Sequence, residues 1–488
     1  MEEIRLLSTQ EISKHDSAQD CWLVIDEAVW DCTAFANSHP GGSSLILNYA
    51  GRDATKAYSE VHSPSIVRES LSPEYFKGNL DRSTIDKAWT KEPLPSNPAQ
   101  AVPEHEKPPL HTIINLNDFE EASARSTSAK THAFYSTAAT DCWTRDMNSS
   151  MLKRIWFRPR VLKNVAEVDT SSSMLSIPLR VPVFICPSGL AKMINPEGEK
   201  ALARAAKSSG IVEIISTNAS YPAAEIIEQA PDHPFMFQLY VNKDRKKSEE
   251  LVKHVEQLGV KAIFVTVDAA GRGKRESDER LRVDEVAINP LTGEKSKTGK
   301  KGGGLTKIVG QFIDQGLTWE DLKWLRSLTK LPILLKGIMT AEDAKLAMKH
   351  KVDGILVSNH GGRNLDFSPP SILVLLELHK QCPEIFDQME VYVDGGFRRG
   401  GDILKALCLG AKAVGMGRPF LFALNYGTEG AEHLVEILKD EMESAMKLLG
   451  IKDLSEVHPG LVNTSDVDHL VPSTSEHPYA KWRPKAKI

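Results

Sequence analysis

Residues that could carry acid–base chemistry stand just after short apolar runs in the second half of the sequence. His360 and Arg363 lie three positions apart, directly after the run that ends at Ser358. An imidazole titrates near working pH and suits a general base, while a guanidinium is a planar fork that binds a carboxylate through two N–H groups. Asp268 ends an earlier run and could orient the imidazole, as the acid does in a hydrolase triad. These residue types suit a site that holds a carboxylate and removes a proton beside it.

The same placement recurs along the chain. Polar residues or glycines end successive apolar runs: Gln238 with Tyr240, Thr266 with Asp268, Lys336, His360, Asp394 with Gly395 and Gly396, and Gly417 with Arg418. Any one of these residues could be a helix cap or an ordinary loop residue. Their repetition favours one site at the carboxyl ends of parallel strands, because those ends meet on one face of a barrel.

The elements that must position these residues are eight short apolar or β-branched runs, separated by helix-like segments of about 15 to 30 residues. The runs are 181–186, 211–217, 235–240, 262–268, 332–336, 354–358, 391–394 and 413–416. Eight strand–helix units in roughly 280 residues favour a closed (β/α)8 barrel, the TIM barrel, over an open doubly wound sheet. A Lys- and Gly-rich insertion at about 271–310 has no apolar period and is predicted to be a mobile loop.

Length and composition indicate a multidomain protein and limit its partners. The chain has 488 residues, and its net charge of −5 leaves no broad cationic surface for nucleic acid. The six cysteines form no C-x-x-C pair, which predicts a reducing compartment and no zinc. No run approaches the roughly 18 apolar residues of a membrane span. A proline-rich linker at 81–109 is expected between a first domain, 1–80, and a second, 110–465, followed by a C-terminal tail, 466–488.

The compartment expected from the acidic start of the chain is the cytoplasm. The mitochondrial intermembrane space and, from the final Ala-Lys-Ile, the peroxisome are the alternatives.

Two histidines of the first domain are candidate metal ligands. His39 lies in a His-Pro-Gly-Gly turn, and His62 follows 23 residues later. Either one alone could be a plain surface residue. The segments around them resemble the cytochrome b5 family over nearly the whole first domain: Trp22-Leu23-Val24-Ile25, Val29-Trp30-Asp31, Phe35, Ala50-Gly51, Asp53-Ala54 and Ala57. The resemblance implies a small α+β domain in which His39 and His62 are the axial ligands of haem b.

This haem is expected to move electrons and do no bond chemistry. Two imidazoles fill both axial positions, so no site is left on the iron for oxygen or substrate. The sequence has no C-x-x-C-H, which predicts a haem held without thioether bonds.

Longer motifs in the second domain resemble the FMN-dependent 2-hydroxy-acid oxidising family from about Leu110 to Leu461. The matching strings are Gln238-Leu239-Tyr240-Val241, Val265-Thr266-Val267-Asp268, Leu335-Lys336-Gly337, Ser358-Asn359-His360-Gly361-Gly362-Arg363 and Asp394-Gly395-Gly396-Phe397-Arg398-Arg399-Gly400. No G-x-G-x-x-G stands between a strand and a helix, which independently disfavours a nicotinamide cofactor.

The resemblance implies roles for individual residues. His360 is the expected base, with Asp268 orienting it, while Arg363, Arg275 and Tyr240 are expected to bind the substrate and Lys336 to offset the negative charge of reduced flavin. The residues expected to hold FMN are Ser188, Ser216, Gln238, Thr266, Lys336, Ser358, Asp394, Gly395, Gly396, Arg398, Gly417 and Arg418. Whether hydrogen leaves the substrate as hydride or as a proton is left open.

Several positions depart from the family pattern, among them Phe134, Asn218, Gly189 and Ala269-Ala270-Gly271, which lacks an expected proline. Phe134 stands where a substrate-contacting tyrosine is expected, which removes one hydroxyl from the site. Asn218 takes a position that is apolar or aromatic in relatives, and Gly189 replaces an alanine in the opposing loop. A wider and more polar pocket is therefore expected, which suits a side chain larger than the methyl group of lactate.

The leading hypothesis is a dehydrogenase that oxidises an L-2-hydroxy acid, with L-lactate as the first candidate. FMN would then pass electrons singly to haem b and on to a cytochrome c-like acceptor. The alternatives are an oxidase that reduces oxygen and a non-catalytic haem and flavin electron carrier. The resemblance also implies a homotetramer.

Overall fold

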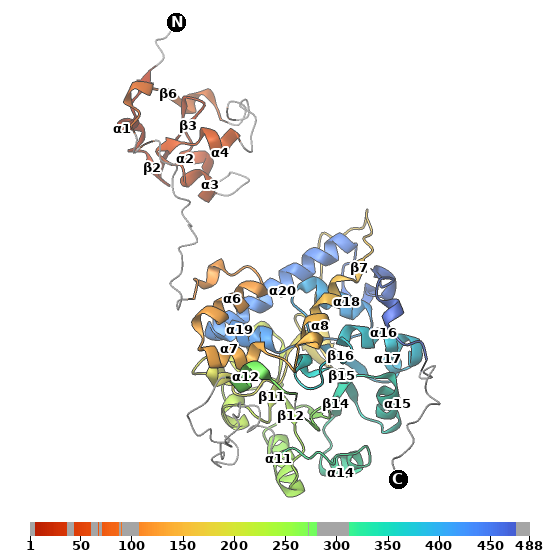
Figure 1. The fold of residues 1–488 in the computed structure, drawn as a ribbon. Coiled ribbons are helices and arrows are strands. Elements are labelled where there is room, and N and C mark those ends of the chain that lie inside the picture. Colours follow the sequence, from red (N-terminus) through yellow and green to blue (C-terminus); the bar gives the residue numbers. More distant parts are fainter. Residues whose placement is uncertain are drawn as a thin grey trace. The chain divides into compact units, whose positions relative to one another are not determined.

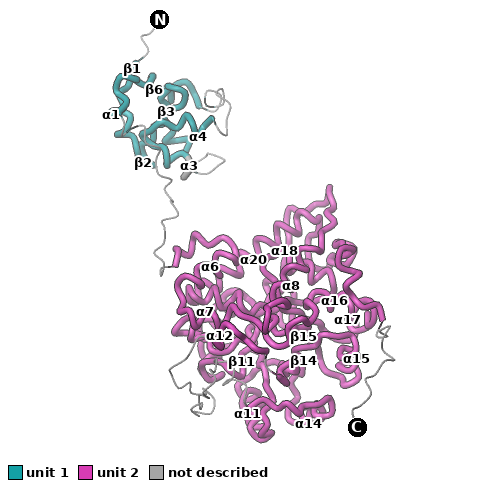
Figure 2. Tube along the Cα trace, in the orientation of Figure 1, with its two compact units in different colours: residues 1–103 teal, residues 104–488 magenta. Residues whose placement is uncertain are grey.

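The computed structural model describes residues 5–36, 43–59, 67, 71–86, 89, 107–271, 273–280 and 312–474. The chain divides into two compact units, residues 1–103 and 104–488, which Figure 2 colours separately. Among the described residues, no helix combines the length and apolar character that a bilayer crossing requires. Most of the predicted Lys- and Gly-rich loop, from 281 to 310, lies outside the described residues.

The first unit is a small α+β domain. Its six-stranded sheet has the order β1-β6-β4-β3-β2, with β5 paired to β3. Asp26 and Glu27 join β3 to β4 with φ of 49° and 65°, the backbone of a tight type I′ hairpin turn. The elements are β1 (Leu6–Leu7), α1 (Thr9–Ile12), β2 (Asp16–Ser17), β3 (Asp20–Ile25), β4 (Ala28–Asp31), α2 (Thr33–Ala36), α3 (Ser43–Leu47), β5 (Arg52–Asp53), α4 (Thr55–Ser59) and β6 (Phe76–Leu80).

The predicted linker, 81–109, has structure at its two ends. Residues 82–84 form a short 3-10 helix, and Thr84 is tied to the first unit because Thr9 donates from its backbone N to Thr84 Oγ1 at 2.9 Å. At the other end, Lys107 donates to Asn425 O at 2.6 Å. Residues 87, 88 and 90–106 lie outside the described residues.

The second unit is built on a closed barrel of eight parallel strands, which confirms the predicted (β/α)8 fold. Every predicted apolar run lies on one strand, and the barrel closes where Val183 pairs with Val414. The strands are β10 (Val183–Ile185), β11 (Val212–Ser216), β12 (Met236–Leu239), β13 (Ile263–Thr266), β14 (Ile333–Ile338), β15 (Gly354–Val357), β16 (Glu390–Asp394) and β17 (Val414–Met416).

Helices surround the barrel, as Figure 1 shows. They are α6 (Leu116–Ser126), α7 (Ala129–Ser136), α8 (Trp143–Lys153), α9 (Glu199–Ser209), α10 (Ala223–Ile227), α11 (Arg245–Gln257), α12 (Glu276–Arg280), α14 (Asp321–Leu328), α15 (Ala341–Lys349), α16 (Ser371–Gln381), α17 (Ile385–Gln388), α18 (Gly400–Cys408), α19 (Arg418–Leu424) and α20 (Gly427–Leu449). The helix α12 lies inside the segment predicted to be a loop without periodic structure.

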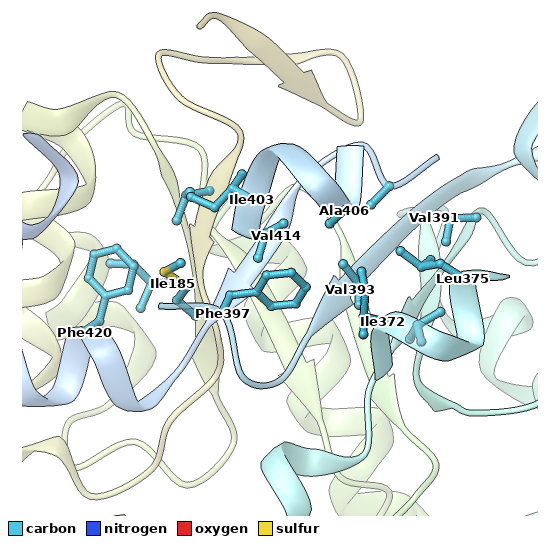
Figure 3. Packing of buried hydrophobic residues seen from close by; sticks show 14 of the residues in the cluster. Ile185, Ile372, Leu375, Val391, Val393, Phe397, Ile403, Ala406, Val414 and Phe420 are labelled. Carbon is cyan, nitrogen blue, oxygen red and sulfur yellow. The ribbon is translucent and has the colours of Figure 1, made fainter. Parts of the chain in front are cut away.

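The side chains of each barrel strand face alternately outward and into the barrel, which creates two separate hydrophobic cores. Val391 and Val393 of β16 point outward and pack with Ile372 and Leu375 of α16 (Figure 3). Tyr392, which lies between them, points into the barrel, because successive strand residues face opposite sides of a sheet.

An apolar plug fills the amino end of the barrel interior. It contains Phe184, Phe264 and Tyr392, together with residues of a hairpin formed by β8 (Ser172–Met174) and β9 (Ile177–Leu179). The hairpin lies at that end because Leu175 donates its backbone N–H to the carboxylate of Glu390, the first residue of β16. With this end filled, the carboxyl end is left for a site.

Candidate active site

A cavity of about 600 Å³ lies at the carboxyl ends of the barrel strands. Its walls include most of the residues predicted from the sequence: Phe134, Ser188, Ser216, Tyr240, Arg275, Lys336, His360, Arg363, Asp394, Gly395, Gly396, Arg398, Gly417 and Arg418. Three others, Gln238, Asp268 and Ser358, contact residues of this wall through the hydrogen bonds given below, and Thr266 is linked to the wall through Gln238. The structure therefore brings all the predicted barrel residues to one place.

His360 lies in a chain of hydrogen-bonding groups at the cavity wall. Its Nδ1 is 3.0 and 3.2 Å from the two carboxylate oxygens of Asp268, and its Nε2 is 3.4 Å from the Tyr240 hydroxyl. Because a carboxylate can only accept, Nδ1 carries the hydrogen and Nε2 is the basic nitrogen. Burial and the Lys336 ammonium lower the pKa of His360, although Asp268 opposes them. The ring is therefore neutral at pH 7 and able to accept a proton.

Asp268 keeps its negative charge in this buried position. Burial alone would raise the pKa of Asp268, but His360 and Lys336 together bring that pKa below its ordinary value. The residue follows β13, and Asn364 donates to its backbone oxygen at 2.8 Å. An ionised carboxylate behind the imidazole would stabilise the imidazolium that proton abstraction creates.

Two arginines give the same end of the cavity a positive potential. Arg363 donates from Nη1 to the carbonyl oxygens of Phe134 at 2.9 Å and Thr137 at 3.3 Å. Burial and the neighbouring Arg363 lower the pKa of Arg275 well below its ordinary value. A bound anion would relieve this repulsion, so the wall beside His360 suits a carboxylate.

Lys336 lies inside the barrel and is 4% exposed. Burial alone would lower the pKa of Lys336, but Asp268 and Asp394 raise it, so the ammonium is charged. Lys336 donates to Ser358 Oγ at 3.0 Å, and its Nζ is 3.9 Å from the Asp394 carboxylate. Asp394 Oδ1 is buried without a hydrogen-bond partner in the described structure, which leaves an acceptor for a ligand hydroxyl or N–H.

A second polar chain crosses three adjacent strands. Ser216 on β11 donates to Gln238 Oε1 at 3.3 Å, and Gln238 on β12 donates to Thr266 Oγ1 on β13 at 2.9 Å. These side chains point into the barrel above the apolar plug. Ser188, in the loop after β10, donates to the Cys186 carbonyl at 3.2 Å.

Glycines and arginines shape the far end of the cavity. Gly395 and Gly396 have φ of 101° and 84°, and a Cβ at Gly396 would lie 2.5 Å from the Asn148 backbone, so only glycine fits there. Arg418 donates to Tyr135 O and to two other carbonyls. Burial and Arg363 lower the pKa of Arg418 to about 9. Such a buried guanidinium suits an anionic group.

Arg398 is held differently from the other predicted anion-binding residues. It donates to Asn117 Oδ1 at 3.0 Å and forms an ion pair with Glu120, both on α6. The residue lines the cavity together with Glu120.

The positions that depart from the family pattern lie in or beside this cavity. The Phe134 ring lies under the Arg363 guanidinium, with 5.3 Å from the guanidinium carbon to the ring centre. The neighbouring Tyr135 hydroxyl donates to the carbonyls of Gly189 and Leu190, so it does not replace the missing hydroxyl. Asn218 and Gly189 both line the cavity, and a Cβ at Gly189 would lie 2.8 Å from Asn218 O.

Comparison with known proteins identifies the barrel. Residues 123–464 match the family model described as FMN-dependent dehydrogenase. This chain belongs to the FMN-dependent dehydrogenase family. Residues 8–81 match the cytochrome b5-like heme/steroid binding domain, so the first unit of this FMN-dependent dehydrogenase is a cytochrome b5-like domain. The cofactors of the two domains are FMN and haem b.

Individual relatives share one or both domains. An L-lactate dehydrogenase (cytochrome) of Saccharomyces cerevisiae is 41% identical over 472 residues, which cover 94% of this chain and 80% of the relative. The 2-hydroxyacid oxidase 2 of Bos taurus is 40% identical over 354 residues, 72% of this chain and 99% of the relative. The flavin-binding domain of baker's yeast flavocytochrome b2 superimposes with a TM-score of 0.67 at 41% identity, covering 78% of this chain and 95% of that chain.

Several residues behind the cavity of this FMN-dependent dehydrogenase were not predicted. Asn148 on α8 and Asn359 exchange reciprocal side-chain hydrogen bonds of 2.9 and 2.8 Å, and Asn359 Oδ1 also accepts from Gly362 N. Asp366 receives hydrogen bonds from the start of α8. Asn359 stood inside a recognised motif and could have been found there, whereas an aspartate in a loop gives no sequence signal.

The predicted haem ligands His39 and His62 both lie outside the described residues. The described part of the b5-like domain has a core that contains Trp30, Ile46 and Leu71, with Phe35 and Tyr58 packed against it. The assignment of the two axial ligands stays a prediction.

Proposed function

We propose that this chain oxidises an L-2-hydroxy acid, with L-lactate as the first candidate, to the 2-keto acid in the barrel. The electrons then pass through haem b, with His39 and His62 as its axial ligands, to a cytochrome c-like acceptor. The observation that carries this proposal is the neutral His360, backed by ionised Asp268, on the same cavity wall as Arg363 and Arg275.

The chemistry assigned to this wall follows from its charges. Arg363 and Arg275 bind the substrate carboxylate and fix the carbon that bears the hydroxyl beside His360. His360 Nε2 takes a proton from the substrate, and Asp268 stabilises the imidazolium that results. The Tyr240 hydroxyl is close enough to His360 to share a hydrogen bond with the substrate oxygen.

The remaining cavity residues fit FMN. Ser188, Ser216, Gln238 and Thr266 would hold its ring, Lys336 and Ser358 would offset the negative charge of the reduced form, and Asp394 Oδ1 offers an unpaired acceptor. Gly395, Gly396, Gly417, Arg398 and Arg418 would hold the phosphate through backbone N–H groups and guanidinium groups. FMN, when bound, accepts two electrons from the substrate and releases them one at a time.

The substrate side chain is proposed to be larger or more polar than a methyl group. The Asn218 amide adds polar character to that part of the wall, and Gly189 packs closely against it, since a Cβ at Gly189 would lie 2.8 Å from Asn218 O. Phe134 supplies no hydroxyl, so carboxylate binding relies on the arginines and Tyr240.

An oxygen-reducing oxidase is the second candidate. The similarity of the barrel to a 2-hydroxyacid oxidase 2 supports it. The cytochrome b5-like domain favours the dehydrogenase, because a haem with two protein ligands would accept electrons from the flavin one at a time. A non-catalytic electron carrier would not need the His360–Asp268 pair or the two buried arginines.

The organisation proposed for the chain follows the composition of its segments. The haem domain is 1–80, the linker 81–109, the dehydrogenase barrel 110–465 and the tail 466–488. We propose that the protein assembles as a homotetramer, as implied by its resemblance to the family; sedimentation of the holoprotein tests this.

The decisive experiment is anaerobic mixing of the holoprotein with a panel of L-2-hydroxy acids, followed by oxygen, cytochrome c or a dye. A dehydrogenase shows reduction of flavin and then of haem, and it reduces cytochrome c. An oxidase shows flavin reduction that is reversed mainly by oxygen. No change in either spectrum with any acid would overturn the proposed function.

A further inference from the structure

The two loops that carry His360 with Arg363 and Arg275 both meet the connection between α7 and α8. Ala139 N donates to Gly362 O at 2.9 Å, and Thr140 N donates to Lys274 O at 2.8 Å. The connection from α7 to α8 therefore joins the loop of His360 and Arg363 to the loop of Arg275.

Gly273 shows how tightly this junction is packed. A Cβ at Gly273 would lie 2.3 Å from Arg363 O, 2.5 Å from Asn364 O and 2.7 Å from Ala139 Cβ. These atoms lie so close that the junction cannot accept even a methyl group at Gly273. The backbone at Gly273 is therefore in close contact with both the α7–α8 connection and the backbone at Arg363.

The carboxylate of Asp366 holds this connection in place. Oδ2 accepts from Thr140 Oγ1 at 2.7 Å and from Asp141 N at 2.9 Å, and Oδ1 accepts from Thr144 N at 2.8 Å. Cys142, at the N-cap of α8, provides no side-chain cap, so Asp366 satisfies the first turn of this helix from another loop. The side chain is 7% exposed.

The backbone around Asp366 is strained on both sides of the contact. Thr140 and Cys142 have φ of 39° and 61°, and His360 and Phe367 have φ of 58° and 63°. Residues with a Cβ adopt this left-handed region rarely, and Thr, which is β-branched, does so least of all. Such conformations persist only where the surroundings fix them.

We propose that Asp366 is a positioning residue for substrate binding, which clamps the α7–α8 connection to the His360–Arg363 loop and so fixes the Arg363 guanidinium. This inference rests on the proposed function, because it takes Arg363 to bind the substrate carboxylate. Arg363 depends directly on the clamped segment, since its Nη1 donates to the carbonyls of Phe134 and Thr137. The His360 ring is held separately, by Asp268 and Tyr240.

Because Arg363 and His360 are held by different contacts, Asp366→Asn should weaken substrate binding more than it slows the chemical step. In Asp366→Asn, one oxygen becomes an NH2 group that faces backbone N–H donors, so the clamp opens. The KM for the best 2-hydroxy acid and the Kd of oxalate should rise about 10-fold or more, since the Arg363 guanidinium that binds the carboxylate is displaced. The value of kcat should fall less than about 3-fold, and the acid limb of the kcat/KM pH profile should not move, because the His360–Asp268 pair is intact.

The experiment uses the full-length holoprotein with Asp366→Asn, Asp366→Ala and Asp366→Glu. The matched control is Glu377→Gln, because Glu377 is 8% exposed and its carboxylate likewise accepts from the first residue of a helix, Ala341 N of α15, at 2.7 Å. Oxalate binding is measured from the change in flavin absorbance, together with flavin content and the melting temperature. Asp366→Glu should recover part of the oxalate affinity, because it restores the carboxylate.

The possible outcomes separate this inference from the proposed function. If the wild type binds oxalate and Asp366→Asn shows the same KM and Kd as Glu377→Gln, Asp366 does not position the site. Equal losses of kcat, flavin content and melting temperature in all three variants would indicate a general structural role and would also overturn the inference. If the wild type neither binds oxalate nor oxidises any 2-hydroxy acid, the proposed function is wrong and the inference falls with it.

Discussion

Replacing Asp268 by Asn removes the charge behind His360 with almost no change in volume. The His360 Nδ1 to Asp268 contacts of 3.0 and 3.2 Å join two side chains that are 20% and 13% exposed, so solvent screens the pair little. A hydrogen bond to a charged partner contributes about 1.5–3 kcal/mol. Because the imidazolium forms only as the substrate loses its proton, the variant should reduce flavin about 10- to 100-fold more slowly.

The same substitution should move the pH dependence in a known direction. The wild-type kcat/KM should fall at low pH with an apparent pKa below the ordinary histidine value, since burial and then Lys336 lower the pKa of His360. Asp268 opposes that shift, so its loss should move the acid limb to still lower pH. His360 must be neutral to act, and activity is therefore lost as the pH falls.

Anaerobic stopped-flow measurement of flavin reduction between pH 5 and 9 tests both effects. Asp20→Asn is a matched control, because Asp20 Oδ2 lies 2.7 Å from His15 Nδ1 in the b5-like domain and not in the barrel. It should leave flavin reduction unchanged. An Asp268→Asn enzyme that reduces flavin within about twofold of the wild-type rate, with an unshifted acid limb, would refute the role given to the pair.

Four further changes test other parts of the description. Arg363→Lys should raise KM and lower kcat, measured with the best 2-hydroxy acid, because an ammonium cannot reproduce the guanidinium fork; unchanged kinetics would exclude carboxylate binding there. Asn218→Leu should shift kcat/KM toward lactate by about 10-fold relative to larger or polar acids, and a wild type already selective for lactate would contradict this. His39→Ala or His62→Ala should abolish a low-spin haem spectrum and leave flavin content unchanged. Glu213→Gln should raise the melting temperature of the barrel, and by more as the pH rises from 5 to 8. Burial and then Glu199 raise the folded-state pKa of Glu213 above its unfolded value. The wild type therefore loses up to about 1.4 kcal/mol of unfolding free energy per pH unit as the pH rises between these two pKa values. An equal gain in melting temperature at all pH values would contradict the raised pKa of Glu213.

The barrel strands could be predicted because each one is a short apolar run between longer helical segments. The ends of the strands were predicted less well. The predicted run begins at Val181, but β10 begins only at Val183, because Pro182 has no N–H to donate to the neighbouring strand. The helix α12 was missed because Glu276–Arg280 is a polar segment with no apolar spacing.

The residues that face the cavity could be predicted because the carboxyl ends of parallel strands meet. The side chains behind the cavity wall, such as Asn148 and Asp366, could not be predicted from the sequence. Asn148 contacts Asn359, and Asp366 contacts Thr144, across more than two hundred positions of sequence, so no local spacing connects the partners. Charge and polarity alone make Asp366 resemble any solvated loop residue.

The pairing of β10 with β17 has a consequence for how the enzyme is made. Val183 belongs to the first barrel strand and Val414 to the last, so the sheet cannot close until nearly the whole chain has left the ribosome. Arg418 follows that last strand, and its carbonyl partner Tyr135 precedes the first. A nascent chain therefore exposes unpaired strand edges for most of its synthesis, and folding of the barrel should be slow compared with that of the b5-like domain, whose hairpins join neighbouring segments. Flavin can then be acquired only after synthesis is almost complete, whereas haem can be inserted much earlier.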